Sequence, residues 1–175
     1  MSTGFNISES KILKGVKIIT PSISSDKRGN IWTSFLREEI DPLLPNGLSF
    51  KHDKFSKSIQ GVLRGIHGDS KSWKLVTTVF GEMIQVVVDC RKDSETYMKY
   101  EKFIINSDNP TSILIPPNMG NAYYVKSDAL LYHYKLAYSG DYIDSDEQFS
   151  LNWNDKRLGI DWYINDPILS NRDAC

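Results

Sequence analysis

The segment from Lys74 to Asp89 constrains the fold more than any other part of the sequence. It contains two runs rich in β-branched residues, Lys74–Phe80 and Met83–Asp89, which are separated only by Gly81 and Glu82. β-Branched residues favour strands, and a two-residue connection that contains glycine is typical of a tight hairpin. The sequence therefore predicts a pair of antiparallel strands in the middle of the chain.

Further segments with strand character precede and follow this pair, and turn residues separate them at intervals of about ten residues. These segments are 16–20, 31–35, 49–55, 61–67, 100–105, 112–115, 122–125 and 130–138. We expect the first two to form another hairpin around residues 24–30, and residues 36–44 to hold a short helix. The spacing predicts a single all-β domain over residues 1–175, a sandwich or barrel with short peripheral helices and an open end suited to a ligand.

Charge and composition exclude several classes of protein. The 21 basic and 22 acidic side chains nearly balance, which predicts no surface for general nucleic-acid binding. No apolar stretch is long enough to span a membrane, and the first residues lack the basic start and apolar run of a signal peptide. The two cysteines form no disulfide framework. We therefore expect a cytoplasmic protein that binds neither nucleic acid nor membranes.

The run Gly61-Val-Leu-Arg-Gly-Ile-His67 carries the strongest chemical signal, because it places an arginine and a histidine among glycines. Side chains alternate between the two faces of a strand, so Arg64 and His67 reach one pocket only if the backbone bulges near Gly65. Glycine inside a strand often marks such a bulge or a close approach to a ligand. From composition alone, a surface histidine at the end of a strand is the simpler interpretation.

The same run resembles the Gly-Val-Leu-Arg-Gly-Leu-His signature of the dTDP-4-dehydrorhamnose 3,5-epimerase family. Other segments resemble motifs of that family in the same order along nearly the whole chain. They are Asp26–Gly29, Ser56–Ser58, Lys74–Val76, Val86–Arg91, Ile115–Tyr124, Tyr134–Lys135, Trp153–Asp155, Gly159–Trp162 and Leu169–Asp173. The resemblance implies a cupin-type jelly roll (a double-stranded β-helix), usually a homodimer in which N-terminal strands join the sheet of the partner.

The resemblance also implies a reaction on a nucleotide-diphosphate 4-keto sugar. The carbonyl at C4 acidifies the protons on C3 and C5, so a base on one ring face forms an enolate and an acid on the other face returns the proton. By resemblance, His67 is the base, Asp173 is its carboxylate partner and Tyr134 is the acid. Lys74 is the expected cation beside the enolate oxygen.

A set of substrate-binding residues follows from the same resemblance. Arg28 and Arg64 match positions that hold the diphosphate, a role that suits a planar guanidinium group. Arg28 is expected to act across the dimer. Either Tyr138 or Tyr142 is expected to stack on the base of the nucleotide. On sequence alone, each of these residues also has an ordinary interpretation as a solvated charge or a core aromatic side chain.

Several positions depart from the family pattern. Asn121 replaces a histidine, and an amide does not titrate near neutral pH. His52 and Lys54 lie in a segment that differs from the family stretch used to recognise the nucleotide, and residues 30–33 differ as well. Our hypothesis is a GDP-linked 6-deoxy-4-keto hexose or heptose, used for capsule or lipopolysaccharide sugars. Inversion at both C3 and C5 is expected, with C3 alone as the alternative.

We expect no metal or other cofactor. The His-x-His pair of metal-binding cupins is missing from Gly65-Ile-His67, and His52 and His133 make no ligand set at a recognisable spacing. The same feature argues against a metal-dependent cupin oxygenase and against a related keto isomerase. A non-catalytic module that binds sugar nucleotides is the alternative from another class. The presence of both His67 and Asp173 argues against it, because binding alone requires no base.

Overall fold

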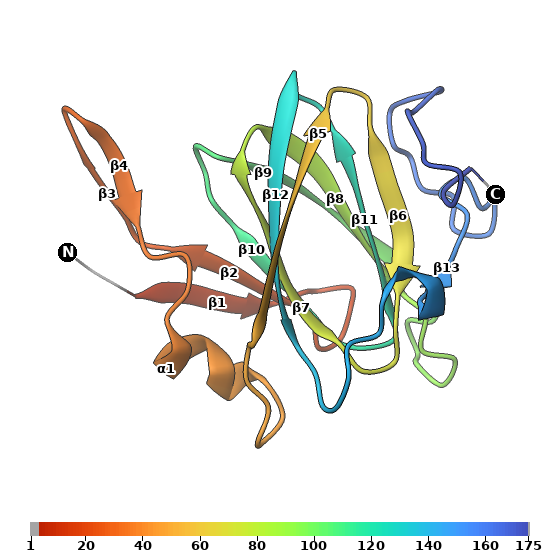
Figure 1. The fold of residues 1–175 in the computed structure, drawn as a ribbon, viewed down its shortest axis with the longest axis horizontal. Helices are drawn as coiled ribbons and strands as arrows, with labels where there is room; N and C mark the ends of the chain where they lie inside the picture. The colour runs from red at the N-terminus through yellow and green to blue at the C-terminus, as the bar shows by residue number, and fades with distance from the viewer. Residues whose placement is uncertain (1–3, 175) are drawn as a thin grey trace.

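The computed structural model describes residues 4–174, which form two antiparallel β-sheets that pack face to face (Figure 1). Within these residues, one sheet has six strands in the order β1-β2-β10-β7-β12-β5, and the other has five in the order β13-β6-β11-β8-β9. The all-β class predicted from the sequence is confirmed. No helix in this part of the chain is long and apolar enough to cross a membrane.

The strands of the larger sheet are β1 (Phe5–Glu9), β2 (Lys17–Pro21), β10 (Ser112–Ile115), β7 (Trp73–Phe80), β12 (Ala129–Ala137) and β5 (His52–Ile59). Those of the smaller sheet are β13 (Phe149–Ser150), β6 (Leu63–Gly68), β11 (Met119–Val125), β8 (Glu82–Asp89) and β9 (Tyr100–Asn106). A separate hairpin consists of β3 (Ile23–Asp26) and β4 (Gly29–Trp32). The helical segments are α1 (Arg37–Ile40) and 3-10 helices at Asp41–Leu43 and Ser145–Glu147, so the short helix expected over residues 36–44 is present.

The main core lies between the two sheets. Val76 of β7 and Leu130 of β12 pack there with Val87 of β8, and all three are fully buried. Burying an apolar side chain of this size stabilises a fold by roughly 1.5–3 kcal/mol. A second cluster, centred on Trp162, joins the C-terminal segment to the smaller sheet. This segment runs alongside β6 in Figure 1, and that course brings the last described residues close to the strand that carries His67.

The hairpin predicted between residues 74 and 89 is wrong in its pairing. β7 pairs with β10 and β12 in the larger sheet, whereas β8 pairs with β11 and β9 in the smaller one. The connection is therefore a corner between the sheets. Gly81 fits this corner because its φ is +90° and a Cβ atom there would lie 2.2 Å from the carbonyl oxygen of Ala129.

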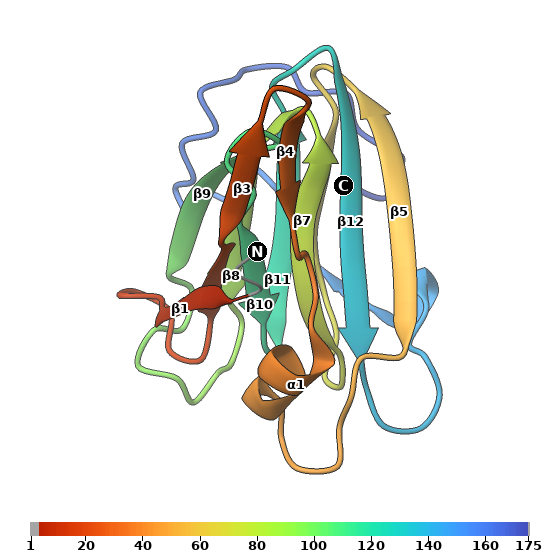
Figure 2. The ribbon, with the colours of Figure 1, turned by 90° about the vertical axis from the view of Figure 1, so that its left-hand side faces the viewer.

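The N-terminal hairpin also differs from the prediction. β2 pairs with β1 and β10 rather than with residues 31–35, and Ile19 anchors it in the core. The observed hairpin is β3 with β4, which turns at Lys27 and Arg28. All residues of β3 are exposed, so no apolar side chain ties this strand to the core. The hairpin projects away from both sheets in Figure 1 and stands in front of the larger sheet in Figure 2.

Candidate active site

A bulge in β6 directs Arg64 and His67 into the same cavity. His67 lies opposite Asn121 of β11 and Arg64 lies opposite Tyr123, so three steps along β6 match two steps along β11. Gly65 lies within the bulge with a φ of +114°, and a Cβ atom there would be 2.5 Å from the carbonyl oxygen of Asn121. Only glycine fits such a position without a shift of the backbone. The structure therefore has the bulge near Gly65 that a shared pocket for Arg64 and His67 requires.

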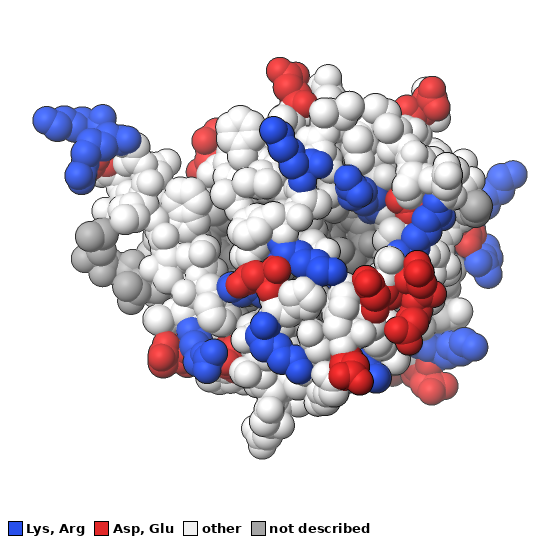
Figure 3. Space-filling view, viewed as in Figure 1, with Lys and Arg blue, Asp and Glu red and all other residues white. Residues whose placement is uncertain are grey.

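The cavity has a volume of about 330 Å³ and is lined by residues from both sheets and from the C-terminal segment. Figure 3 shows a hollow near the centre of this face, with basic side chains beside it. The lysine, arginine and aspartate side chains that line it are Lys54, Arg64, Lys74, Arg172, Asp144 and Asp173. The excess of basic groups suits an anionic ligand such as a diphosphate. Among residues 4–174, no three His, Cys, Asp or Glu side chains are grouped as metal ligands.

His67 is paired with Asp173. Nε2 of His67 lies 2.5 Å from Oδ1 of Asp173, and the carboxylate side chain is only 3 % exposed. Burial alone would raise the pKa of Asp173, but its hydrogen bond with His67 and another from Ser170 outweigh burial and lower that pKa. An ionised carboxylate accepts the proton on Nε2, so Nδ1 of His67 carries the free lone pair. Nδ1 has no protein partner among the described residues.

Lys74 is buried beside the cavity, with 7 % of its surface exposed. Its Nζ lies 3.6 Å from Oδ2 of Asp69, which is also buried. Oδ1 of Asp69 accepts hydrogen bonds from the backbone N–H groups of Lys71 and Ser72. Burial lowers the pKa of Lys74, and the charge of Asp69 opposes that shift. An ammonium group held in this way is placed to stabilise negative charge that develops in the cavity.

Tyr134 lines the same cavity from β12, on the other sheet from His67. It packs near Tyr132, with 5.7 Å between ring centroids, and Tyr132 stacks on Tyr123 at 4.2 Å. Burial raises the pKa of Tyr134, and nearby Lys54 opposes that change. The phenol therefore stays protonated at neutral pH and has a proton to donate.

Asn121 lines the cavity and is held by two residues that the sequence analysis did not identify. Its Oδ1 accepts a hydrogen bond from Nε2 of Gln85 at 2.6 Å, and its Nδ2 donates to the hydroxyl of Tyr132 at 3.2 Å. Gln85 is fully buried in β8. A polar residue in the middle of an otherwise apolar strand is the feature of the sequence that could have identified it.

The candidates for recognition of the nucleotide base lie at the rim of the cavity. Nζ of Lys54 donates to the hydroxyl of Tyr142 at 3.0 Å, and both residues line the cavity. Tyr138 instead contacts Nδ1 of His52 through its hydroxyl at 3.3 Å. Ring contacts place His52 and Tyr138 against Tyr142, 4.8 and 5.7 Å away between centroids. Of the two tyrosines, Tyr142 lines the cavity and Tyr138 does not.

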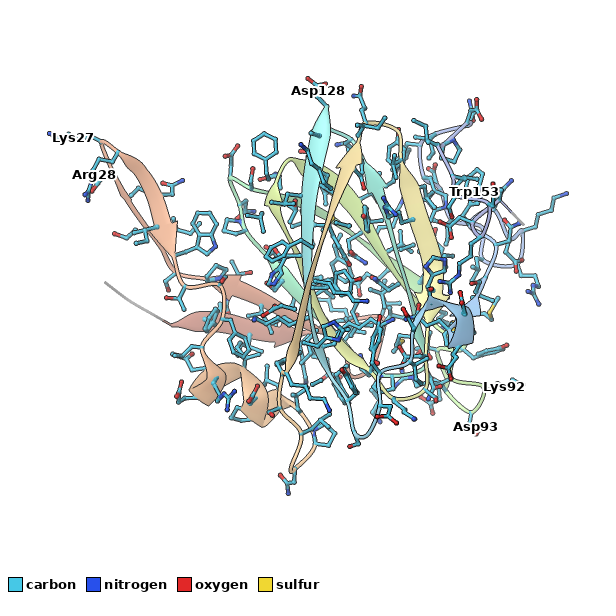
Figure 4. The ribbon with its side chains drawn as sticks, in the orientation of Figure 1. Lys27, Arg28, Lys92, Asp93, Asp128 and Trp153 are labelled. Carbon is cyan, nitrogen blue, oxygen red and sulfur yellow. The ribbon has the colours of Figure 1, made fainter. Side chains whose placement is uncertain are left out.

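The two predicted diphosphate-binding arginines lie in different places. Arg64 lines the cavity, and its Nε donates to Oγ of Ser58 at 3.2 Å. Arg28 lies at the tip of the β3–β4 hairpin, remote from the cavity of its own chain (Figure 4). Its side chain is 84 % exposed and pairs with Asp26. Arg28 is thus placed to contact something outside its own subunit.

Arg172 is a further basic residue of the cavity, and the sequence analysis did not single it out. Its Nε donates to Oγ of Ser150 at 3.1 Å, which holds the side chain against β13. It lies inside the matched segment Leu169–Asp173, next to the proposed carboxylate partner of His67. An arginine between two matched positions was the available signal.

Comparison with known proteins identifies the family. The family model described as dTDP-4-dehydrorhamnose 3,5-epimerase matches residues 10–175 of the chain. The chain belongs to this family. The match confirms the resemblance drawn from the ordered motifs, and it makes the protein an enzyme of the isomerase class.

Members of the epimerase family similar to this chain include enzymes of two kinds. The 3,5-epimerase of Shigella flexneri is 31 % identical over 161 residues, which cover 90 % of this chain and 87 % of that protein. The dTDP-4-dehydrorhamnose 3-epimerase of Streptomyces niveus is 30 % identical over 167 residues, which cover 92 % and 78 %.

A solved structure of the epimerase family has the same fold as this chain. It is the dTDP-6-deoxy-D-glucose-3,5-epimerase of Legionella pneumophila in complex with dTDP-4-keto-L-rhamnose. The two structures superimpose with a TM-score of 0.88 and 34 % identity, over 98 % of this chain and 90 % of that one. The cupin-type jelly roll implied by the resemblance is therefore confirmed.

Proposed function

We propose that the protein is an epimerase that inverts C3, and also C5, of a nucleotide-diphosphate 4-keto-6-deoxy sugar through an enolate. One observation carries this proposal. A single cavity contains His67 of the smaller sheet, paired with Asp173 of the C-terminal segment, and it also contains Tyr134 and the buried cation Lys74, both of the larger sheet. A base, an acid on the other side and a cation are the three groups that the reaction needs.

Each group has one role in the proposed reaction. His67 removes the proton from C3, and Asp173 stabilises the imidazolium ion that forms. Lys74 stabilises the charge that moves to the C4 oxygen, and Tyr134 returns a proton to the opposite ring face. One proton leaves and one returns, so the sugar is neither oxidised nor reduced. The same groups act on C5 after the ring is repositioned.

The nucleotide is proposed to extend from the sugar toward the rim, with the diphosphate at Arg64 and the base on Tyr142. The Legionella relative was solved with a dTDP-linked sugar. In this chain, the residues that contact Tyr142 include His52 and Lys54, which lie in the segment that departs from the family pattern. Because of this departure we propose a nucleotide other than dTDP, namely a GDP-linked hexose or heptose as used for capsule or lipopolysaccharide. Such a charged substrate does not cross membranes unaided, so we place the reaction in the cytoplasm.

We also propose that the protein is a homodimer. The outer face of the larger sheet and the β3–β4 hairpin carry exposed apolar side chains, including Phe55 at 61 % and Ile31 at 58 % exposure. These two residues and Trp32 line a groove of about 390 Å³. Contiguous apolar surface of this kind is typical of subunit interfaces. A partner seated on this face would receive the hairpin, and Arg28 would reach the cavity of the partner.

Solvent exchange tests the proposed reaction. The protein is incubated in deuterium oxide with dTDP-, GDP- and CDP-linked 4-keto-6-deoxy sugars, and the C3 and C5 protons are followed by NMR. We expect exchange at both carbons with the GDP-linked sugar, and exchange about 10³-fold slower in His67→Asn because the base is lost. Circular dichroism of the variant confirms that it is folded.

Each other outcome overturns a different part of the proposal. Exchange at C3 alone would make the protein a 3-epimerase, as the Streptomyces niveus relative is named. Faster exchange with the dTDP-linked sugar would overturn the assignment of guanine. Tight nucleotide binding without exchange on any sugar would favour the non-catalytic binding module.

A further inference from the structure

Gln85 is a fully buried polar residue that the proposed reaction does not use. Its Nε2 lies 3.1 Å from the carbonyl oxygen of Val86 and 3.0 Å from that of Ala122. A backbone carbonyl only accepts hydrogen bonds, so the atom of Gln85 that faces both must be the nitrogen. These two contacts fix which end of the Gln85 amide is the donor, a choice that usually depends on neighbouring side chains.

The orientation of Gln85 in turn fixes that of Asn121. The same Nε2 lies 2.6 Å from the Asn121 side chain, which must therefore present its Oδ1 there. The nitrogen of Asn121 then lies 3.2 Å from the hydroxyl of Tyr132, closer to it than Oδ1 at 3.5 Å. That hydroxyl accepts from Asn121 and donates to Oε1 of Gln85 at 3.2 Å. The three side chains thus form a closed ring of hydrogen bonds.

We infer that Gln85 is a positioning residue that turns an N–H of Asn121 toward the sugar. Asn121 lines the cavity and lies directly opposite His67 in the pairing of β6 and β11. Its Nδ2 carries two hydrogens, and Tyr132 takes one of them. Among residues 4–174, no acceptor takes the second. This N–H is the donor for a sugar oxygen beside the carbon that His67 deprotonates.

The inference rests on the proposed epimerase reaction and gives Asn121 a defined role in it. An amide donor stays neutral over the whole working pH range, unlike a histidine at the same position. If the amide were reversed, its carbonyl oxygen would face the sugar and repel an enolate oxygen. Reversal would also set the N–H groups of Gln85 and Asn121 against each other in a buried place, where an unmade hydrogen bond is costly.

The Gln85→Met substitution tests this role, because it keeps the length of the side chain and removes both its donor and its acceptor. We expect kcat for exchange to fall about tenfold to a hundredfold, since a misdirected donor no longer stabilises developing charge. KM should change little, because Gln85 does not line the cavity that holds the nucleotide. The matched control is Gln60→Met, which should leave kcat unchanged. Gln60 is exposed, and its Nε2 donates to the carbonyl oxygen of Lys126 outside the cavity.

A double-mutant cycle separates positioning from a general structural effect. If Gln85 acts through Asn121, then Gln85→Met combined with Asn121→Ala is no slower than Asn121→Ala alone, because no amide remains to be oriented. Losses that multiply in the double variant would overturn the inference. So would an unchanged kcat in the folded Gln85→Met protein.

A measurement on the unsubstituted protein covers the case in which Gln85→Met does not fold. In ¹⁵N-labelled protein, a side-chain amide proton of Asn121 should show a nuclear Overhauser contact with the ring of Tyr132. Contacts of both amide protons with the side chain of Gln85 instead would mean that the amide is reversed, and the inference would be wrong. This readout does not depend on turnover. It therefore distinguishes a wrong orientation from failure of the proposed function, which the exchange reaction of the unsubstituted protein tests.

Discussion

The buried pair of Lys74 and Asp69 shows, at the scale of single residues, how a carboxylate keeps a neighbouring amine protonated. Burial by itself favours the neutral amine, and the carboxylate 3.6 Å away opposes it. Lys74 is useful to the proposed reaction only as a cation, since it must attract the charge on the C4 oxygen. Activity that depends on it is therefore present below the pKa of Lys74 and is lost as the pH rises through that pKa.

The Asp69→Asn substitution should move the alkaline limit of activity to lower pH. Without the carboxylate, burial and the nearby Arg172 both lower the pKa of Lys74 with no opposing charge. A pH profile of kcat for solvent exchange measures the shift. Asp128→Asn, at the exposed end of β12 (Figure 4), is the control that makes the same chemical change far from the cavity. An alkaline limit that stays in place would show that Asp69 does not hold the charge on Lys74.

Asp173→Asn should slow exchange by roughly 10²- to 10⁴-fold, because an amide does not stabilise the imidazolium of His67. Asp155, which pairs with Arg157 in the C-terminal segment and does not line the cavity, offers the matched control Asp155→Asn. Steady-state exchange rates of the two variants provide the comparison. Equal rates in Asp173→Asn and the unsubstituted protein would remove Asp173 from the mechanism.

The same carboxylate should also make stability depend on pH. The pKa of Asp173 is lowered in the folded protein, so its contribution is present above the ordinary carboxyl pKa and is lost as the pH falls through the folded value. Urea unfolding at neutral pH should therefore show Asp173→Asn to be less stable by about 1.5–3 kcal/mol, the range for a hydrogen bond to a charged group. The difference should shrink in acid. A constant difference at all pH values would mean that the lost contact does not depend on charge.

The sequence was more informative about the residues of the cavity than about their geometry. His67, Lys74, Tyr134 and Asn121 all line one cavity, as the motifs suggested. Gln85 was missed because its role depends on β8 lying beside β11, and no local pattern in the sequence encodes that neighbour. Whether the residues in the cavity act as proposed is left to the substitutions above.

At the scale of elements, the positions of strands were predictable and their partners were not. β7 and β8 have the β-branched composition expected of strands, but the short connection at Gly81 serves equally as a hairpin turn and as a corner between sheets. Pairing is decided by which faces are buried together, and that is a property of the whole chain. The need for a bulge at Gly65 was predictable. Side chains alternate along a strand, so Arg64 and His67 reach one pocket only if that alternation is interrupted between them.

Gly65→Ala should disrupt the bulge. The residue has a positive φ, and its new Cβ atom would meet the carbonyl oxygen of Asn121 at 2.5 Å. We expect a loss of about 2–4 kcal/mol in the free energy of unfolding, together with slower exchange because His67 is redirected. Gly47→Ala isolates the cost of the backbone angle, since Gly47 has a φ of +82° with nothing within 4 Å of a Cβ. Equal destabilisation of both variants in urea would mean that the close contact at Gly65 is unimportant.

At the scale of the whole molecule, the β3–β4 hairpin holds Arg28 away from the cavity of its own chain. If it completes the cavity of a partner, then Arg28→Ala should raise KM roughly tenfold or more, through loss of hydrogen bonds to the diphosphate. A mixture of Arg28→Ala and His67→Asn, refolded together, should then recover activity. In each mixed dimer, one of the two cavities holds both an intact Arg28 and an intact His67. Mixed dimers that form but remain as inactive as His67→Asn would contradict the proposal that each subunit supplies Arg28 to the cavity of its partner.

The placement of His67 on β6 and Tyr134 on β12 assigns the proposed base and acid to different sheets. Their separation is therefore governed by the packing of the sheets, which typically lie about 10 Å apart, and not by any loop. A flat ring bound between the sheets presents one side to each of them. Loops at the rim can then diverge to admit another nucleotide or a longer sugar while the handedness of the product stays the same. In this arrangement, the packing of the two sheets determines which face of the ring loses a proton and which face gains one.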